Sequence, residues 1–130
     1  MTDDEVQEVL ERYTRRLATL GPVPEALGWT KNRHVLRYHV LLEPWRLTTE
    51  RLLDFGCGFG DMYAYCRDHF PGLRYHGFDL NPDLVAAGRA RYPGAVFVSA
   101  LTREGLPQLK EATMRHLRDG SRRGGAPSNP

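Results

Sequence analysis

The sequence predicts an α/β fold in which a parallel sheet of about three strands follows a helical N-terminal segment. Short apolar runs alternate with amphipathic stretches, and glycine or proline separates most of them. Strand–helix alternation of this kind implies right-handed crossovers and therefore parallel strands. The chain has 130 residues, the usual size of one domain. Its 41% hydrophobic and 26% charged residues are typical of a globular protein and exclude a disordered or fibrous chain.

The helical lead-in covers residues 1–45 and begins with an amphipathic helix. Thr2 and Glu5 have the spacing of a capping box, and Gly21-Pro22 ends the helical pattern. Because a lone helix is marginal in water, we expect its stripe to pack over the core. The apolar residues recur at helical spacing: Val6, Val9, Leu10, Tyr13, Leu17 and Leu20.

A second helix is predicted from about Asn32 to Glu43, where Pro44 ends it. Four residues form its expected inner face: Val35, Leu36, His39 and Leu42.

Three strands are predicted over residues 51–55, 74–79 and 95–99, because each run is short, apolar and bounded by turn residues. Helices over 60–69 and 81–91 connect them. Asn81-Pro82 is a favoured cap and first residue for the second of these helices.

The pattern weakens after Ser99. A thin stripe predicts a divergent helix within 101–118, and Gly, Pro and Ser dominate 119–130, which predicts a disordered tail. Residues 101–130 hold six Lys/Arg against three Asp/Glu, so the basic excess lies there. The net charge of +2 is too small to predict nucleic-acid binding.

The cysteines and the N-terminus predict a cytoplasmic protein without a metal site. Cys57 and Cys66 are too few for a disulfide framework, and no His pair follows at zinc-ligand spacing. The acidic start lacks the features of a secretory signal, and no run approaches a membrane span. Cys57 is expected to be a small loop residue and Cys66 a core residue.

A glycine-rich turn joins the first strand to its helix. Gly56, Gly58 and Gly60 permit positive φ and a close ligand, and the free N–H groups at the helix start favour an anion. Asp61 stands where a dinucleotide fold has its third glycine, and its charge would repel a pyrophosphate. The pattern therefore disfavours an NAD-dependent dehydrogenase, and no P-loop lysine follows.

Two carboxylates complete the motif. Asp54 closes the first strand, where it would attract a cationic group such as an ammonium. Asp79 ends the second strand, where an acid accepts bonds from ribose hydroxyls, and Leu80 would pack on a purine. Together these residues predict a nucleoside ligand with a cationic, amino-acid-like tail and no phosphates.

The stretch LLDFGCGFGD, followed by YHGFDLNPDLV, resembles the class I, Rossmann-like S-adenosylmethionine-dependent methyltransferases over about residues 27–99. The resemblance implies a three-layer fold with S-adenosylmethionine as cofactor, the methionine part near Asp54 and the ribose at Asp79. Trp29, Arg33 and Arg37 precede the motif, and packing or surface roles are favoured for them. The implied cofactor-binding residues are Asp54, Gly56, Cys57, Gly58, Gly60, Asp79 and Leu80.

The resemblance stops after the third strand. The family's larger sheet places the first strand at its centre, and an acidic residue usually follows the third strand. Here Val98-Ser99-Ala100 runs into a divergent segment, and Glu104 is a poor substitute for that acid. We therefore expect an N-terminal half, truncated or frame-shifted, with one edge of strand 51–55 open to a homodimer or partner chain.

The leading prediction is a methyltransferase-like domain that binds the cofactor and is inactive alone because its substrate half is missing. The methyl acceptor and the catalytic residues stay unknown. The alternative is a non-enzymatic interaction module, or a methyltransferase remnant, with a basic tail containing Lys110, Arg115, Arg118, Arg122 and Arg123. The expected organisation is a partial methyltransferase domain over 1–118, consisting of the lead-in 1–45, the cofactor-binding unit 46–100 and the helix 101–118, and then the tail 119–130.

Overall fold

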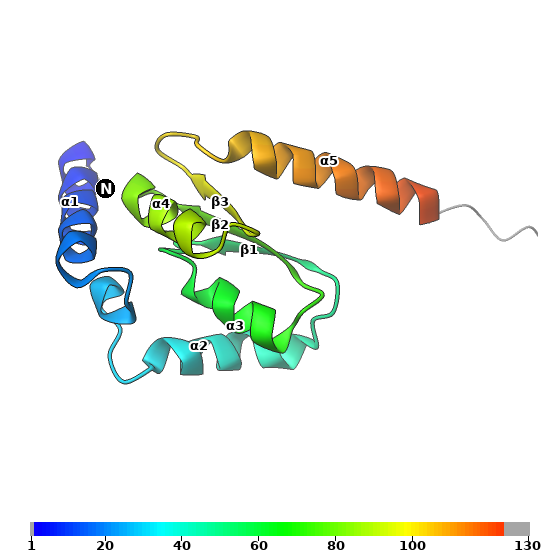
Figure 1. The fold of residues 1–130 in the computed structure, drawn as a ribbon, viewed down its shortest axis with the longest axis horizontal. Helices are drawn as coiled ribbons and strands as arrows, with labels where there is room; N and C mark the ends of the chain where they lie inside the picture. The colour runs from blue at the N-terminus through cyan, green and yellow to red at the C-terminus, as the bar shows by residue number, and fades with distance from the viewer. Residues whose placement is uncertain (1, 124–130) are drawn as a thin grey trace, which may run out of the picture.

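The computed structural model describes residues 2–123 and has a single parallel sheet at its centre (Figure 1). Strands β1 (Arg51–Phe55), β2 (Arg74–Asp79) and β3 (Val96–Ser99) lie in the order β1-β2-β3. Both strand pairs are parallel. This confirms the predicted α/β class and the three strands.

Helices lie on both sides of the sheet, so the fold has three layers. α5 runs along the opposite side of the sheet from α3, and α2 lies outside α3 (Figure 1). The α-helices are α1 (Asp3–Leu20), α2 (Arg33–Leu42), α3 (Asp61–His69), α4 (Pro82–Arg91) and α5 (Leu106–Arg123), with short 3₁₀ helices η1 (Pro24–Leu27) and η2 (Glu43–Trp45).

The main core lies between the sheet and helices α3 and α4. The Tyr75 ring of β2 lies 5.4 Å from Tyr63 of α3 and 6.0 Å from Phe97 of β3. Val85 of α4 is fully buried beside them, and Cys66 is a core residue as predicted. Because the three strands are parallel, their carboxyl ends emerge at one edge of the sheet, next to this core.

The first helix has the predicted capping box, since Thr2 and Glu5 bond each other's backbone N–H groups. No residue of α1 is buried. Its Tyr13 and Leu17 pack on a small second cluster that includes Phe59 and Leu84. The helix is thus a cover beside α4, and does not enter the main core.

The inner face of α2 differs from the prediction. The buried residues are His34, Tyr38 and Leu42, whereas Leu36 is 63% exposed. The reason is aromatic packing, because the Tyr38 ring lies 5.9 Å from both the His34 and Tyr65 rings. Hydrophobicity alone predicts that a leucine is buried in preference to a histidine or a tyrosine.

The last helix begins within the predicted segment and ends later than predicted. Residues 101–105 form a loop, and α5 continues to Arg123, so 119–123 are helical and not a disordered tail. Extending a formed helix costs little, and one glycine such as Gly120 costs only about 1 kcal/mol. The rest of the predicted tail, 124–130, lies outside the described residues.

One edge of β1 is unpaired within residues 2–123, as predicted. On one face of this strand Leu53 is 46% exposed and Phe55 is 76% exposed. α5 reaches the start of the strand, where the Arg51 guanidinium donates to Thr113 Oγ1 at 3.2 Å. Within the part of the chain that the structure describes, no helix combines the length and apolarity needed to cross a membrane.

Candidate functional site

The glycine turn after β1 has the backbone conformation that its sequence requires. Gly56, Gly58 and Gly60 all have positive φ, at 77°, 55° and 89°. The N–H groups of Gly56 and Cys57 donate to the Phe78 carbonyl at 2.8 and 2.9 Å, which ties the turn to β2. A side chain at Gly56 would meet no atom within 4 Å, so this glycine faces open space.

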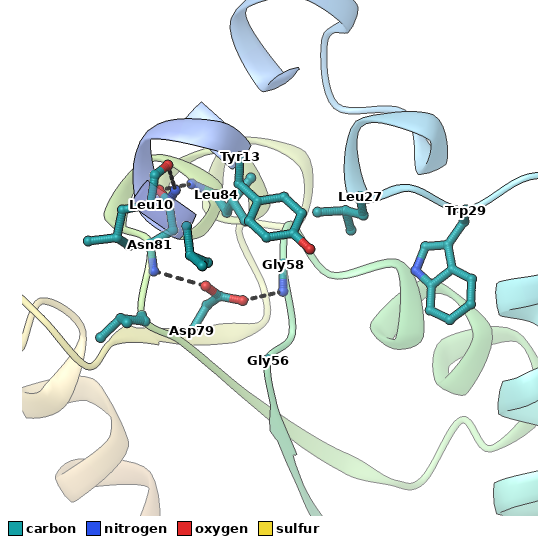
Figure 2. A pocket seen from close by; sticks show the side chains of 11 residues that line it. Leu10, Tyr13, Leu27, Trp29, Gly56, Gly58, Asp79, Asn81 and Leu84 are labelled. Atoms are coloured by element: carbon teal, nitrogen blue, oxygen red, sulfur yellow. Dashed lines mark hydrogen bonds between the residues drawn. The ribbon is translucent and has the colours of Figure 1, made fainter. Parts of the chain in front are cut away.

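The Asp79 carboxylate joins the glycine turn to the end of β2. One oxygen accepts from the Gly58 N–H at 2.8 Å and the other from the Asn81 N–H at 2.9 Å (Figure 2). These two bonds fix the plane of the carboxylate. Each oxygen keeps a further lone pair with which it can accept a hydrogen bond from a ligand hydroxyl.

A first cavity of about 280 Å³ opens above this carboxylate (Figure 2). The glycine turn and the end of β2 form its floor, and α1 forms one wall. Asp79 is the one charged side chain among the described residues that line it. The lining consists of Val9, Leu10, Tyr13, Leu27, Trp29, Gly56, Gly58, Asp79, Leu80, Asn81 and Leu84.

A second cavity of about 270 Å³ adjoins the first. The two share Leu27, Trp29 and Gly56. Ligand pockets usually enclose about 300–1,000 Å³, so the two cavities reach that range only together. The second is lined by Leu27, Trp29, Arg37, Tyr38, Leu41, Asp54, Phe55, Gly56, Cys57 and Met62.

Asp54 is the carboxylate of the second cavity. Its Oδ2 accepts from the Tyr75 hydroxyl at 2.6 Å. Burial raises the pKa of Asp54 above 3.8, the negative charge of Asp79 raises it further, and the Tyr75 bond opposes them. A positively charged ligand group beside Asp54 would therefore stabilise the ionised form of this carboxyl.

Six of the seven predicted binding residues line these cavities. Gly58, Asp79 and Leu80 line the first, Asp54 and Cys57 the second, and Gly56 both.

Gly60 lines neither cavity. A Cβ on it would lie 2.6 Å from the Phe97 ring, so this glycine permits close packing of α3 on the sheet. Asp61 also points elsewhere, because its Oδ1 pairs with Arg91 at 3.0 Å. Asp61 would therefore not repel a pyrophosphate in either cavity, contrary to the expectation from the sequence, whereas Asp54 and Asp79 still disfavour a phosphate there.

The Cys57 thiol is buried and donates to the Gly58 carbonyl at 3.4 Å. Burial raises its pKa, as it raises the pKa of Cys66 to about 12. A protonated thiol is a poor nucleophile, which agrees with the prediction of a loop role for Cys57.

Sequence reasoning missed the contribution of α1 and of Asn81 to the site. Val9, Leu10 and Tyr13 belong to the stripe that predicted the helix, but periodicity does not show what a stripe packs on. Asn81 was recognised only as a helix cap. Nothing in the sequence singled out Leu27.

Asn81 holds α1 over the first cavity. Its Nδ2 donates to the Leu10 carbonyl at 3.0 Å and to Thr14 Oγ1 at 3.1 Å. Its Oδ1 caps α4 by accepting from the Asp83 and Leu84 N–H groups. The Thr14 hydroxyl donates in turn to the Asp83 carboxylate at 2.8 Å. The end of β2 and the covering helix thus form one hydrogen-bonded unit.

Comparison with known proteins finds a family model that matches the central segment. The family model described as "Methyltransferase domain" matches residues 53–113, which include the glycine turn, Asp79 and the start of α5. Trans-aconitate 2-methyltransferase of Escherichia coli O1:K1 is 34% identical over 59 residues, 45% of this chain and 23% of that protein. The protein of the same name from strain UMN026 is 36% identical over the same length. The matched segment thus spans about a quarter of these relatives.

Two solved structures resemble the chain in outline. A TehB-like SAM-dependent methyltransferase from Corynebacterium glutamicum has a TM-score of 0.46 and 24% identity, over 72% of this chain and 46% of the other. The plantazolicin methyltransferase BpumL, solved with SAH, has a TM-score of 0.40 and 15% identity, over 75% and 42%.

Residues 53–113, which contain the glycine turn and Asp79, thus match a methyltransferase domain, the class of protein that the sequence motif resembles. S-adenosylmethionine, the predicted cofactor, is the cofactor of this class.

Proposed function

We propose that this chain binds S-adenosylmethionine across the two adjoining cavities. The adenosine lies in the first cavity, with its ribose hydroxyls on Asp79 and its base beside Leu80. The amino-acid end lies in the second cavity, with its ammonium near Asp54. Gly56 lies between the two parts, where the missing side chain leaves room for the ligand.

The observation that carries the proposal is the Asp79 carboxylate. Two backbone N–H groups hold it at the floor of the first cavity, which has no cationic side chain among its described lining residues. Such a site suits a group with hydroxyl donors and repels a phosphate. The distribution of charge therefore favours a nucleoside without phosphates.

The bound cofactor supplies a methyl group on a cationic sulfur, which a nucleophile can attack. The residues described above hold and orient the cofactor, and orientation of this kind contributes much of the rate of a transfer reaction. We propose that residues 1–118 act as the cofactor-binding part of a methyltransferase. In this proposal, elements beyond the described residues select the methyl acceptor.

Calorimetric titration with S-adenosylhomocysteine tests the binding proposal. The wild-type chain is expected to bind it saturably. Asp79→Asn is expected to weaken binding by about tenfold or more, because hydrogen bonds to a charged group contribute about 1.5–3 kcal/mol. Asp68→Asn is the matched control, since Asp68 is exposed on α3 and lines neither cavity. Equal affinities of the two variants would contradict the assigned site.

A methyltransferase assay tests the second part of the proposal. The chain is offered broad classes of acceptor, with and without candidate partner proteins. We expect methyl transfer only when a partner is present. Transfer by the chain alone would show that its own residues form the acceptor site. Binding without any transfer would favour a cofactor-binding, non-catalytic role.

A further inference from the structure

A third cavity, of about 270 Å³, lies at the amino ends of the strands, whereas the first two cavities lie at the carboxyl ends. The first residues of β1, β2 and β3, which are Arg51, Arg74 and Val96, all line it. Ala112 of α5 lines it as well. A side chain at Gly94, also in the lining, would meet no atom within 4 Å, so the cavity faces open space there. This cavity is separate from the proposed cofactor site.

Three basic side chains gather in the third cavity. Arg51 and Arg74 are direct partners in the register of β1 and β2, and His76 lies two residues along β2, on the same face of the sheet. Like charges directly opposite each other on a sheet are unfavourable. Burial lowers the pKa of His76, and the positive charges of Arg51 and Arg74 lower it further, so the three groups interact. No acidic side chain is among the described residues that line this cavity, which therefore has an excess of positive charge.

Two of these side chains have a nitrogen atom without a hydrogen-bond partner. Arg51 Nε and His76 Nδ1 are both buried, and neither has a partner among the described residues. His76 is 3% exposed, and the Arg51 guanidinium uses Nη1 to donate to Thr113 Oγ1 of α5. A buried donor without a partner is unfavourable, and native structures usually supply one. An arginine nitrogen can only donate and a histidine Nδ1 can also donate, so the cavity is short of acceptors.

We infer that the third cavity binds the phosphate group of a small molecule, which Arg51 and His76 hold between the sheet and α5. Phosphate supplies both the negative charge and the acceptor oxygens that the cavity lacks. The Thr113 bond at Nη1 orients the Arg51 guanidinium, and its Nε edge can bind two oxygens of one phosphate. Arg74 adds its positive charge to the cavity.

The inference goes beyond the proposed function and does not depend on it. S-adenosylmethionine has no phosphate, and its proposed cavities lie at the opposite edge of the sheet. The number of basic groups favours phosphate over a carboxylate, because a phosphate ester has a charge of about −1.5 to −2 at neutral pH and a carboxylate only one negative charge. A bound phosphate would also join α5 to β1 and β2, since Arg51 already bonds Thr113 of that helix.

Titration of the isotope-labelled chain with inorganic phosphate, followed by NMR, tests the inference. The signals are the Arg51 Nε–H group and the His76 ring. Sodium chloride at matched ionic strength and acetate are compared with phosphate, and glycerol 3-phosphate tests whether an ester is preferred. The variants are Arg51→Gln and Arg51→Lys, with Arg33→Gln as the control, because Arg33 is exposed on α2 and does not line this cavity. A thermal unfolding curve shows that each variant is folded.

Phosphate is expected to shift both signals along a saturating curve, and acetate to bind more weakly. Arg51→Gln is expected to weaken phosphate binding, read from the His76 ring, by about tenfold or more. Arg51→Lys keeps the charge but loses the planar edge, and is expected to fall between wild type and Arg51→Gln. Arg33→Gln matches the wild type, and saturating S-adenosylhomocysteine leaves the phosphate affinity unchanged. A preference for glycerol 3-phosphate or for inorganic phosphate supports the site and identifies its source of phosphate.

Three results would overturn the inference. One is a response of the Arg51 and His76 signals no larger than that to sodium chloride. The second is a folded Arg51→Gln variant that binds phosphate as tightly as the wild type. The third is a set of phosphate-induced shifts at the Gly56 and Gly58 amides in place of Arg51 and His76. Failure to bind S-adenosylhomocysteine would contradict the proposed function alone and would leave this inference standing.

Discussion

Asp54 and Asp79 are carboxylates at the ends of neighbouring strands, but their surroundings differ. Asp79 accepts two backbone N–H bonds, which stabilise its charge. Asp54 has one phenolic donor, and burial raises the pKa of its carboxyl, so its charged form is disfavoured in the folded state. At the scale of the residue, these surroundings agree with the proposal that Asp79 orients the ribose and Asp54 binds the ammonium.

Asp54→Asn is expected to stabilise the chain at neutral pH and to weaken S-adenosylhomocysteine binding. The folded pKa of Asp54 lies above its ordinary value of 3.8, so the unfolded chain loses this proton first as pH rises. The free energy of unfolding therefore falls as pH rises through the window between these pKa values. Relief of a destabilised site typically contributes about 0.5–2 kcal/mol.

Urea unfolding of both proteins at several pH values measures this effect. The variant is expected to lack the wild-type decline above pH 3.8 that arises from this group. A variant less stable than wild type at pH 7, with the decline unchanged, would contradict this account of Asp54.

His76 provides the opposite pH dependence. Its side chain is 3% exposed and its Nδ1 has no partner among the described residues. Burial lowers its pKa below 6.5, and the positive charge of Arg51 lowers it further. The unfolded chain therefore binds a proton more readily, and stability is lost as pH falls below 6.5. His76→Leu is expected to flatten this acid limb in thermal unfolding curves.

A chain with His69→Leu is a useful control, because the His69 Nδ1 has a partner in the Tyr65 carbonyl at 2.9 Å. If His76→Leu and the wild-type chain lose stability in parallel between pH 7 and pH 5, the assigned role of His76 is wrong.

Among single residues, the sequence indicated a role most clearly where the residue type has one dominant chemical use. Asp54, Gly56 and Asp79 were predicted to lie together because strand ends and a glycine turn bring them to one edge of the sheet, and they line the two cavities. Gly60 belonged to the same pattern, but it packs against Phe97. A motif alone does not separate a glycine that admits a ligand from one that admits a ring.

At the scale of the element, α1 depends on polar contacts for its position. No residue of α1 is buried, and its attachment to the end of β2 runs through Asn81 and Thr14. Because α1 forms one wall of the first cavity, this attachment also shapes the proposed adenosine site.

Thr14→Val is expected to loosen α1 and lower stability by about 1–2 kcal/mol, because Asn81 Nδ2 and the Asp83 carboxylate lose a partner. Hydrogen exchange of the α1 amides measures the loosening, and S-adenosylhomocysteine affinity should fall with it. Thr19→Val is the control, since the Thr19 hydroxyl bonds only within its own helix. Similar exchange rates in both variants would show that the Thr14 hydrogen bonds do not hold α1 in place.

Element boundaries were largely predictable, because local chemistry sets them. The capping box at Thr2, the turn at Gly21 and the Asn81-Pro82 cap all lie where the sequence placed them. The inner face of α2 was not predictable, since Tyr38 is buried by ring contacts with distant residues such as Tyr65.

At the scale of the whole molecule, the sheet ends in an apolar edge. Within residues 2–123 no strand pairs with the outer edge of β1. Phe55 is 76% exposed there, and its ring stacks on Phe78 at 5.1 Å. Exposed apolar edges of this kind favour pairing with another chain.

Phe55→Lys is expected to reduce concentration-dependent self-association of the chain, because a charge on an edge opposes strand pairing. It should cost about 0.5–1.5 kcal/mol of stability through loss of the stacked ring pair. Leu101→Lys, at a side chain 54% exposed outside the strands, is the control. Sedimentation velocity over a range of concentrations measures the effect. A wild-type chain that stays monomeric throughout would contradict the assigned role of this edge.

The order of elements and the parallel sheet were predictable because hydrophobic period and turn residues determine them. The placement of α1 beside α4 was not, since it depends on one buried asparagine that the sequence marks only as a cap. The structure thus adds α1 as one wall of the first cavity, whereas the glycine turn and the end of β2, which form its floor, were predicted from the sequence to lie together.

The most direct test of the account is the change in amide chemical shifts when S-adenosylhomocysteine is added to the isotope-labelled chain. We expect the largest changes at Gly56, Gly58 and Asn81, with smaller ones along α1, and none at Gly72 or Gly94. Saturating changes at the first group would support a cofactor site on the glycine turn and Asp79. A folded chain whose glycine-turn amides do not shift would contradict that site.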